Sequence, residues 1–427
     1  MIMMKTFLIR ALVLIGLTAS LNAQAQLRVE IFGVGASQIP VAIATFANEA
    51  MAPQKISDII RADLARSGYF KVIDAGAVMS ETTSINLSDW KSRGADALVV
   101  GSVQRLADGR LDVRYKLIDT IKGVELSAHS ILSIPARARV SSHQIADDVF
   151  EKLLGVPGVF ATRIAYVVKN AANTQFRIEV ADADGEDARV ALNSNQPIMS
   201  PSWSPDGTKI AYVSFEKQKA IVYVQNLVTS QRTLVANLKG TNSAPSWSPD
   251  GSQLVMTLSA SGLGQIYIAN ADGSGLRRIS YSNGIDTEAR FSPDGQSLFF
   301  TSDRSGGPQI YRMSVTGGEA KRVTFSGDYN ISPRIAPDGK TLAYISRRGG
   351  KFQLFALDLA QNQELRLTEA GFDESPSFAP NGRYIMYATR AGGRGTLAVV
   401  SVDGRIKQSL TTQIGDIQEP TWGPFMK

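Results

Sequence analysis

The sequence predicts two domains, a small α/β domain followed by a six-bladed β-propeller that is closed by the C-terminal strand. Three observations predict this architecture. A seven-residue pattern returns at a nearly constant interval from residue 201 onward, incomplete units flank the complete ones, and the preceding part of the chain lacks the repeat. Self-similarity at a fixed period indicates one structural unit that is copied several times.

The repeat begins as Pro201-Ser-Trp-Ser-Pro-Asp-Gly207. Further copies start at Pro245, Ala289, Pro333, Pro376 and, shortened, Pro420, so the steps are 44, 44, 44, 43 and 44 residues. The third position is always a large apolar residue, which suits the space between stacked sheets. The Pro-Asp-Gly part is turn chemistry. Apolar runs such as Lys209–Val213 follow in each copy. About four short strands per copy are typical of a propeller blade.

The two ends of the array complement each other. A strand pair at Arg163–Val167 and Phe176–Val180 precedes the first complete copy, and the last Pro-Thr-Trp is followed by no strand. Together they make one blade, which gives six in total. Joining the C-terminal strand to the first blade removes sheet edges that would otherwise invite aggregation.

The first 25 residues are predicted to be a signal peptide. Lys5 and Arg10 supply the positive region, Ala11–Leu21 is an apolar run, and cleavage between Ala25 and Gln26 fits the small-x-small pattern. The alternative is a retained membrane anchor, but the run is short for a bilayer. We therefore expect a periplasmic, monomeric mature protein without stable membrane insertion.

Residues 26–156 are predicted to form the α/β domain, and residues 160–427 the propeller. Alternating and apolar runs indicate strands, and apolar residues at helical spacing indicate two helices, one within Pro53–Ser67 and one that ends near Leu154. The predicted strands are Leu27–Phe32, Ile39–Ile43, Phe70–Ile73, Asp96–Val103 and Leu111–Leu117. Gly155–Gly158 is the expected hinge.

Composition excludes several classes of function. The chain has no cysteine, a net charge of +6 and only two histidines, His129 and His143. Disulfides and thiol catalysis are excluded, and no dense basic run argues for nucleic acid. Both histidines are expected at the surface. No Gly-x-Ser-x-Gly elbow occurs. We therefore expect no catalytic residue, no metal and no cofactor, and we interpret Asp182–Asp187 as a hairpin turn rather than a calcium loop.

The innermost strand of each blade should place its flanking residues at the mouth of the ring. These residues include Met199, Ser200, Asn242, Ala244, Thr287, Glu288, Asn330, Ser332, Glu374 and Glu419. They are either solvated loop ends or a recessed surface that binds a protein or a ligand, since loops on a rigid scaffold often carry function.

Several stretches resemble the TolB family of the Tol-Pal system. They include Thr162–Val167, Met199–Val213, Asp96–Gly101, Phe150–Leu153, Thr301–Tyr311 and Phe372–Gly382. The resemblance covers both domains in order. It implies a periplasmic scaffold that binds the lipoprotein Pal at the propeller mouth and TolA through an N-terminal segment. Such a scaffold helps to maintain outer-membrane integrity and invagination during division, and other outer-membrane proteins are further possible partners.

The resemblance also implies site residues. Ala244, Thr287, Glu288 and Asp303 match Pal-contacting positions of the family, and Met199, Ser200, Asn242, Glu374 and Glu419 complete the expected Pal surface. The expected TolA segment is Gln26–Gly35, with Leu27, Arg28, Val29, Glu30 and Ile31 as its contacts. Thr241 stands where studied members of the family carry a partner-contacting histidine. We further expect that the leading strand either docks on the protein or is released for TolA.

Two other classes of function were weighed against this scaffold. Similar blades occur in propellers attached to serine peptidases, but such enzymes need a separate hydrolase domain with a Ser-His-Asp set. A carbohydrate or small molecule could instead bind in the tunnel, and aromatic residues at the mouth would favour it. The predicted mouth residues are mostly small and polar.

Overall fold

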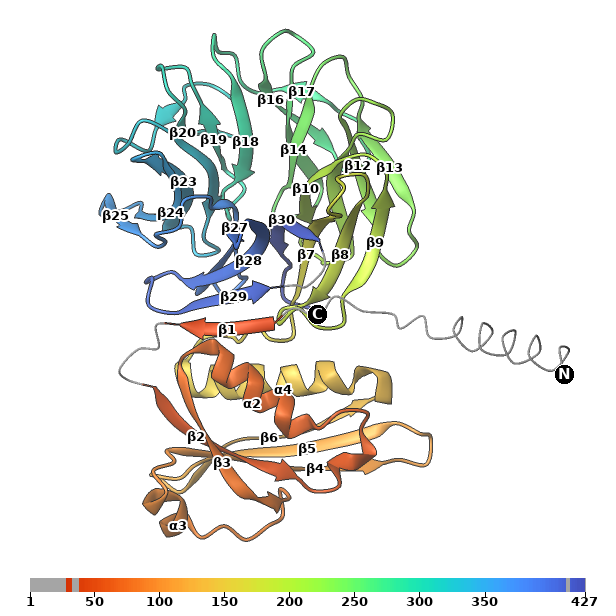
Figure 1. Cartoon of the computed structure of the whole chain (residues 1–427), viewed down its shortest axis with the longest axis vertical. Coiled ribbons are helices and arrows are strands. Elements are labelled where there is room, and N and C mark those ends of the chain that lie inside the picture. The colour runs from red at the N-terminus through yellow and green to blue at the C-terminus, as the bar shows by residue number, and fades with distance from the viewer. Residues whose placement is uncertain (1–27, 33–37, 412–414, 427) are drawn as a thin grey trace, which may run out of the picture.

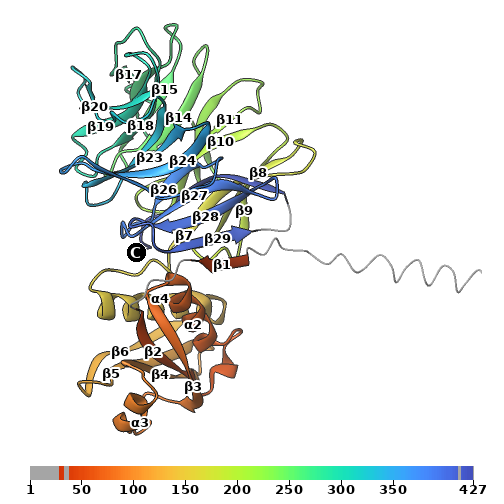
Figure 2. The same ribbon diagram turned by 60° about the vertical axis from the view of Figure 1, so that its left-hand side comes forward.

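The computed structural model describes residues 28–32, 38–411 and 415–426. The signal peptide, the cleavage site at Ala25 and Gln26, and the predicted contact Leu27 lie outside the described residues. Two domains are visible in Figure 1, a ring of blades above a smaller α/β domain. Turning the molecule shows the smaller domain beside one part of the ring (Figure 2). This confirms the predicted fold class.

The first domain is a mixed five-stranded sheet with the order β3-β2-β4-β5-β6, in which β2 runs parallel to β3 and β4 and the other pairs are antiparallel. Its elements are β2 (Ile39–Phe46), η1 (Glu49–Met51), α2 (Ile56–Ser67), β3 (Phe70–Met79), α3 (Leu87–Ser92), β4 (Ala97–Arg105), β5 (Leu111–Asp119), β6 (Val124–Ser133), η2 (Pro135–Arg137) and α4 (Ala138–Leu154). The short helix α3 was not predicted.

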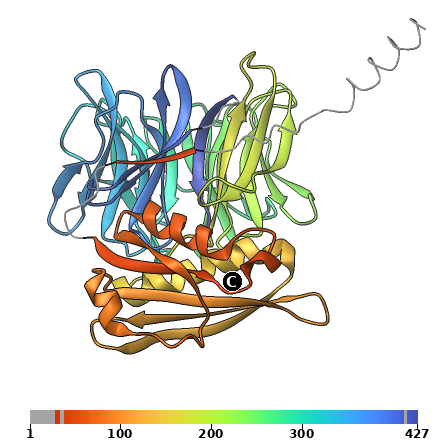
Figure 3. The ribbon, with the colours of Figure 1, turned by 60° about the horizontal axis from the view of Figure 1, so that its bottom comes forward.

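Both long helices pack on one face of this sheet, toward the propeller (Figure 3). Ile60 and Leu64 of α2 and Val149 of α4 are buried against Val41 and Val99 of the sheet. Apolar residues three and four apart in α2 form the stripe that the sheet covers. Gly68 ends α2 and Gly155 ends α4, both with positive φ, as expected for glycine after a helix.

The propeller has six antiparallel blades. Blade 1 contains β30 (Asp416–Trp422), β7 (Arg163–Lys169), β8 (Phe176–Asp182) and β9 (Arg189–Ser194). Blade 2 contains β10 (Ile198–Trp203), β11 (Lys209–Ser214), β12 (Ile221–Asn226) and β13 (Arg232–Ala236). Blade 3 contains β14 (Asn242–Trp247), β15 (Gln253–Leu258), β16 (Gln265–Asn270) and β17 (Arg277–Arg278).

Blade 4 contains β18 (Asp286–Phe291), β19 (Ser297–Ser302), β20 (Gln309–Ser314) and β21 (Lys321–Arg322). Blade 5 contains β22 (Asn330–Ile335), β23 (Thr341–Arg348), β24 (Lys351–Asp358) and β25 (Gln363–Arg366). Blade 6 contains β26 (Glu374–Phe378), β27 (Tyr384–Ala391), β28 (Arg394–Ser401) and β29 (Lys407–Thr411), and β1 (Arg28–Phe32) adds a fifth strand to it. The C-terminal strand β30 is the innermost strand of blade 1, which confirms the predicted closure.

The repeated sequence pattern links neighbouring blades and closes turns, as predicted. The indole N–H of Trp247 donates to the carbonyl of Ser202 in blade 2 at 3.0 Å, and that of Trp203 donates to Thr421 in blade 1 at 3.2 Å. In the blade 3 turn, the carboxylate of Asp250 accepts from the backbone N–H of Ser252 at 3.1 Å. These two tryptophans therefore link neighbouring blades, while Asp250 holds the turn.

No helix within the described ranges is long and apolar enough to cross a membrane.

Candidate functional site: the propeller mouth and the domain interface

The six innermost strands begin at one end of the ring, called here the mouth, and end at the Ser-Pro-Asp-Gly turns. The α/β domain contacts the turn end, where the side-chain amide of Asn381 donates to the carbonyl of Pro157 at 2.9 Å. The mouth is therefore the end of the ring away from this contact.

One residue in each innermost strand has a left-handed backbone, and all six hold the same place in the repeat. They are Ser200, Ala244, Glu288, Ser332, Ser375 and Glu419, with φ between 51° and 56°. Each lies where the pairing with the second strand shifts register. Positive φ is uncommon for residues other than glycine, and a bulge leaves a backbone N–H outside the sheet ladder. No glycine or other sequence signal marks these positions.

Two glutamates in this ring bind the backbone of the following blade. The Glu288 carboxylate accepts from the backbone N–H of Ser332 at 2.9 Å and from its hydroxyl at 2.8 Å. Glu419 accepts from the backbone N–H of Ser200 in the same way. The bulge frees these N–H groups, and a carboxylate from the preceding blade satisfies them. Glu288 and Glu419 therefore join adjacent blades, besides lying where a partner could reach them.

Two arginines, absent from the predicted site, follow the bulges in blades 4 and 5. The guanidinium of Arg290 donates to the carbonyl of Ala289 at 3.1 Å, and that of Arg334 donates to Pro333 at 2.8 Å. Burial lowers the pKa of Arg334 to about 10 and holds the pKa of Arg290 well below its usual value. Both guanidinium groups are treated as cations at neutral pH, because arginine side chains are not deprotonated in proteins.

Among the carboxyl groups of the mouth residues, Glu419 has the most strongly raised pKa. Its side chain is half-buried. Burial, together with the negative charges of Glu374 and Glu288, raises the pKa of Glu419 to about 7 against the hydrogen bond from Ser200. The residue is therefore partly protonated near neutral pH.

The other predicted mouth residues differ in how exposed their side chains are and in what they contact. Met199 is 41% exposed and Glu374 is exposed, whereas Thr287 is half-buried beside Thr257. Asp303 accepts from the backbone N–H of Ile285 at 2.6 Å and so fixes a mouth loop. Thr241 is exposed.

Asn242 corrects the prediction of a side chain that faces the mouth. It is fully buried, and its amide donates to the carbonyls of Ala220, Leu238 and Gly240 at 2.9–3.2 Å. Asn330 is equally buried, and its amide donates to Gln309. These side chains tie loops together inside the blades, because a buried amide needs hydrogen-bond partners. Neither side chain can contact a partner.

The N-terminal strand lies on the outer edge of blade 6. β1 pairs with β29 in antiparallel register, with Arg28 opposite Thr411 and Phe32 opposite Lys407. The predicted contacts Arg28, Val29, Glu30 and Ile31 belong to this strand. Figure 1 shows β1 between β29 and the helices α2 and α4 of the α/β domain. Residues 28–32 of the predicted TolA segment are thus paired with blade 6 in this structure.

Sequence reasoning missed a second polar site, at the interface of the two domains. His143, expected at the surface, lies within α4 and is only 1% exposed. It contacts Asp63 of α2 and faces Asp182 and Asp184 of the β8–β9 turn. The turn itself is as predicted, closed by a hydrogen bond from Gly185 N–H to the carbonyl of Asp182 at 2.8 Å. His129 is exposed, as predicted.

Asp63, His143 and Asp184 are close enough together to suggest a metal centre, since one ligand atom of each lies within 4.8 Å of the others. Arg66 and Arg139 already contact these carboxylates. The donor set therefore fits an ion-pair network better than a cation site, because two guanidinium groups already pair with these carboxylates.

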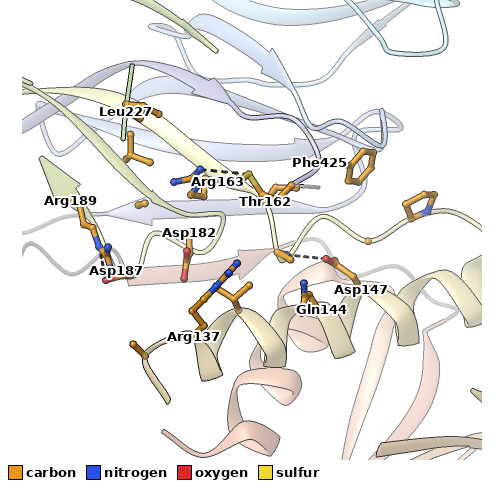
Figure 4. Close-up of a pocket in the computed structure, with 18 of the residues that line it drawn as sticks. Arg137, Gln144, Asp147, Thr162, Arg163, Asp182, Asp187, Arg189, Leu227 and Phe425 are labelled. Carbon is orange, nitrogen blue, oxygen red and sulfur yellow. Dashed lines mark hydrogen bonds and ion pairs between the residues drawn. The ribbon is translucent and has the colours of Figure 1, made fainter. Parts of the chain in front are cut away.

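An interdomain cleft of about 810 Å³ opens beside this network. Figure 4 shows Arg137 and Asp147 of the α/β domain on one side and Arg163, Asp182 and Arg189 of blade 1 on the other. Arg163 lies over the ring of Trp203 at 5.6 Å, and its Nε has no hydrogen-bond partner. The cleft brings charges of both signs together.

Comparisons with known proteins agree with this architecture. Residues 150–426 match the family described as the TolB beta propeller domain, and residues 27–126 match the TolB amino-terminal domain. The Tol-Pal system protein TolB of Aromatoleum aromaticum is 64% identical over 409 residues, covering 96% of each chain. The protein of the same name from Dechloromonas aromatica is 54% identical over 241 residues, covering 56% of this chain and 55% of its own. The crystal structure of TolB from Acinetobacter baumannii is 38% identical with a TM-score of 0.87, covering 94% of this chain and all of that one (100%).

Proposed function

Because this chain belongs to the TolB family of Tol-Pal system proteins, we propose that it is a periplasmic scaffold without catalytic activity. It binds Pal at the propeller mouth and TolA through its N-terminal segment, and it thereby helps to maintain outer-membrane integrity and invagination during division. The observation that carries this proposal is the near full-length similarity to a Tol-Pal relative, at 64% identity.

The rigidity of the mouth supports the Pal part of the proposal. The ring of left-handed positions is held by contacts between blades, such as Glu288 with Ser332. A binding surface that is already ordered loses little conformational entropy when a partner docks. Met199 offers exposed apolar area in the same ring, and Glu374 offers exposed charge.

Isothermal titration of the mature protein, Gln26–Lys427, with the soluble domain of Pal tests the mouth. We expect saturable one-to-one binding that Glu288→Ala weakens roughly tenfold or more, in the range of a substantial interface residue. Glu319→Ala is the matched control, because Glu319 is exposed in the β20–β21 connection at the turn end.

A second variant separates a binding effect from a folding effect. Glu288 also braces blade 5, so its loss could alter the ring. Met199→Glu changes an exposed side chain instead and places a charge on the same surface. Full-strength binding by both variants, or no binding by the unmodified protein at high micromolar concentration, would exclude the mouth as the Pal site.

The docked N-terminal strand supports the TolA part of the proposal. Main-chain pairing of β1 with β29 uses the same backbone groups that strand addition to another protein would use. TolA therefore competes with blade 6 for the segment. Occupancy of the mouth biases the choice between the docked and the released strand, which makes the two sites allosterically coupled.

A cross-strand disulfide tests this competition. Glu30 and Ser409 are opposed in the β1–β29 register, and the chain has no native cysteine. Opposed residues of antiparallel strands have Cα separations compatible with a disulfide. We expect oxidised Glu30→Cys/Ser409→Cys protein to lose TolA binding and to regain it on reduction, while Pal binding persists. Unchanged TolA binding by the oxidised protein would contradict release of the strand.

A further inference from the structure

His143 lies at the centre of a buried charge cluster that joins the two domains. Its Nδ1 is 2.5 Å from Asp63 Oδ2, and its Nε2 is 3.6 Å from Asp182 Oδ2 and 4.0 Å from Asp184 Oδ2. Carboxylate oxygens thus face both ring nitrogens. A neutral imidazole would direct a nitrogen lone pair at a carboxylate, whereas an imidazolium directs an N–H at each side.

The charges of the cluster balance only when this histidine is protonated. Arg66 contacts Asp63 at 2.8 Å, Arg139 contacts Asp182 at 2.9 Å, and both arginines contact Asp184. Three carboxylates and two guanidinium groups leave one negative charge, which an imidazolium cancels. A divalent cation would instead leave one positive charge. Buried charges are tolerated when they are paired, so a proton is the cation that fits.

The cluster connects side chains of the α/β domain with side chains of blade 1. Asp63 and Arg66 lie on α2, Arg139 and His143 on α4, and Asp182 and Asp184 in the β8–β9 turn of the propeller. One turn after His143, the carboxylate of Asp147 accepts from the backbone N–H groups of residues 160 and 161 at 2.7 and 3.0 Å. The interface also contains neutral contacts, such as the packing of Tyr69 against Tyr384 with ring centroids 6.2 Å apart.

We propose that His143 is a proton-dependent latch between the two domains. With the imidazolium present, α2 and α4 stay locked to the β8–β9 turn. Loss of the proton leaves an unpaired negative charge inside the interface, and the α/β domain then moves about the linker at residues 155–158. This proposal concerns the coupling of the domains and does not depend on Pal or TolA.

The direction of the pH dependence follows from the neighbours of the histidine. Burial alone would lower the pKa of His143, but the carboxylates of Asp63 and Asp182 outweigh it and raise the pKa above its ordinary value. The docked state therefore binds this proton more tightly than the undocked state. The latch is closed at pH values below the ordinary histidine pKa. It opens as the pH rises through the raised pKa that His143 has in the docked state. Each unit by which the pKa of His143 differs between the docked and the undocked state changes the opening equilibrium about tenfold.

Asp147 must be separated from this effect. Burial raises the pKa of Asp147 to about 7, so it too ionises near neutral pH and favours opening as pH rises. The guanidinium groups of Arg66 and Arg139 face the same carboxylates and complete the set of charged neighbours. A variant that removes only the imidazole of His143 separates its contribution to the pH dependence of opening from that of Asp147.

The protonation state is measured directly by nitrogen-15 NMR of the imidazole side chains of the full mature protein. The chain has only two histidines, so His129→Gln assigns both signals. We expect the His143 ring to carry both protons at about pH 6, which is below the ordinary histidine pKa. A His143 signal typical of a neutral ring at about pH 6 would overturn the proposal.

The domain arrangement is measured by electron–electron distance spectroscopy. Spin labels on Ala107→Cys and Val228→Cys report the distance between the two domains. Both residues are exposed and lie in different domains, and the chain has no native cysteine that would also be labelled. We expect a narrow distance distribution at about pH 6 that broadens at about pH 9. His143→Gln should be broad at both pH values, and His129→Gln, the matched control, should behave like the parent protein. A pH response that persists in His143→Gln, or its absence in the parent protein, would overturn the latch.

Discussion

At the scale of single residues, the two glutamates of the mouth show how one side chain combines a structural and a surface role. Glu288 and Glu419 each accept the backbone N–H that a bulge in the next blade leaves unpaired. The sequence indicates their place at the mouth from the repeat. It does not indicate this brace, because the partner N–H is 44 residues away for Glu288 and 219 residues away for Glu419.

Replacing Glu419 by glutamine is expected to stabilise the protein at alkaline pH. The pKa of Glu419 is raised to about 7 from 4.5, so the native state binds this proton more tightly than the unfolded chain. Its contribution to the free energy of unfolding is therefore present below about pH 4.5 and is lost as pH rises toward 7. Glutamine stays neutral and retains an acceptor for Ser200. We expect about 1–3 kcal/mol of added stability near pH 8.

Urea unfolding at two pH values checks this expectation. The difference between Glu419→Gln and the parent protein should be large near pH 8 and small near pH 4. Glu319→Gln, at an exposed position, is the control. Equal stability of Glu419→Gln and the parent protein near pH 8 would show that Glu419 is not desolvated in the native ring.

At the scale of elements, closure of the ring depends on β30. This strand pairs with β7, and its Trp422 donates from the indole N–H to the hydroxyl of Thr162 at 2.9 Å. It is also the strand that brings Glu419 next to Ser200. Without it, β7 would become an exposed inner edge of blade 1, and blades 6 and 1 would lose their common contact.

Deletion of residues 420–427 is therefore expected to abolish cooperative unfolding or to cause aggregation. Deletion of residues 424–427 is the matched control, because it keeps the whole of β30. Circular dichroism melting measures the cooperativity of unfolding of both deletion variants, and size-exclusion chromatography measures their aggregation. An unchanged, cooperative melting transition in the longer deletion would mean that the ring is stable without its closing strand.

At the scale of the whole molecule, the arrangement of the two domains connects the N-terminal strand to the interface. Helix α2, which carries Asp63, also contacts β29, because the side-chain amide of Gln408 donates to the carbonyl of Arg66 at 2.7 Å. Tyr384 of blade 6 donates to the carbonyl of Ser67 at 2.8 Å. The strand that holds β1 is thus in contact with a helix of the proposed latch.

The sequence by itself determined the number of blades, the turn residues, the interblade tryptophans and the closing strand. These features repeat at a fixed interval, and each follows from local chemistry that every copy shares. It also excluded disulfides and thiol catalysis, since the chain has no cysteine. The TolB resemblance added the family, which the comparisons confirm.

Only the tertiary structure decided which side chains lie together. The left-handed positions carry no glycine, Asn242 is turned inside, and His143 is buried although its neighbours in the sequence are polar. Each depends on a group from another blade or from the other domain, and such pairs are far apart along the chain. A local pattern records the face of its own element, whereas burial and charge pairing are set by the surface that packs against that face.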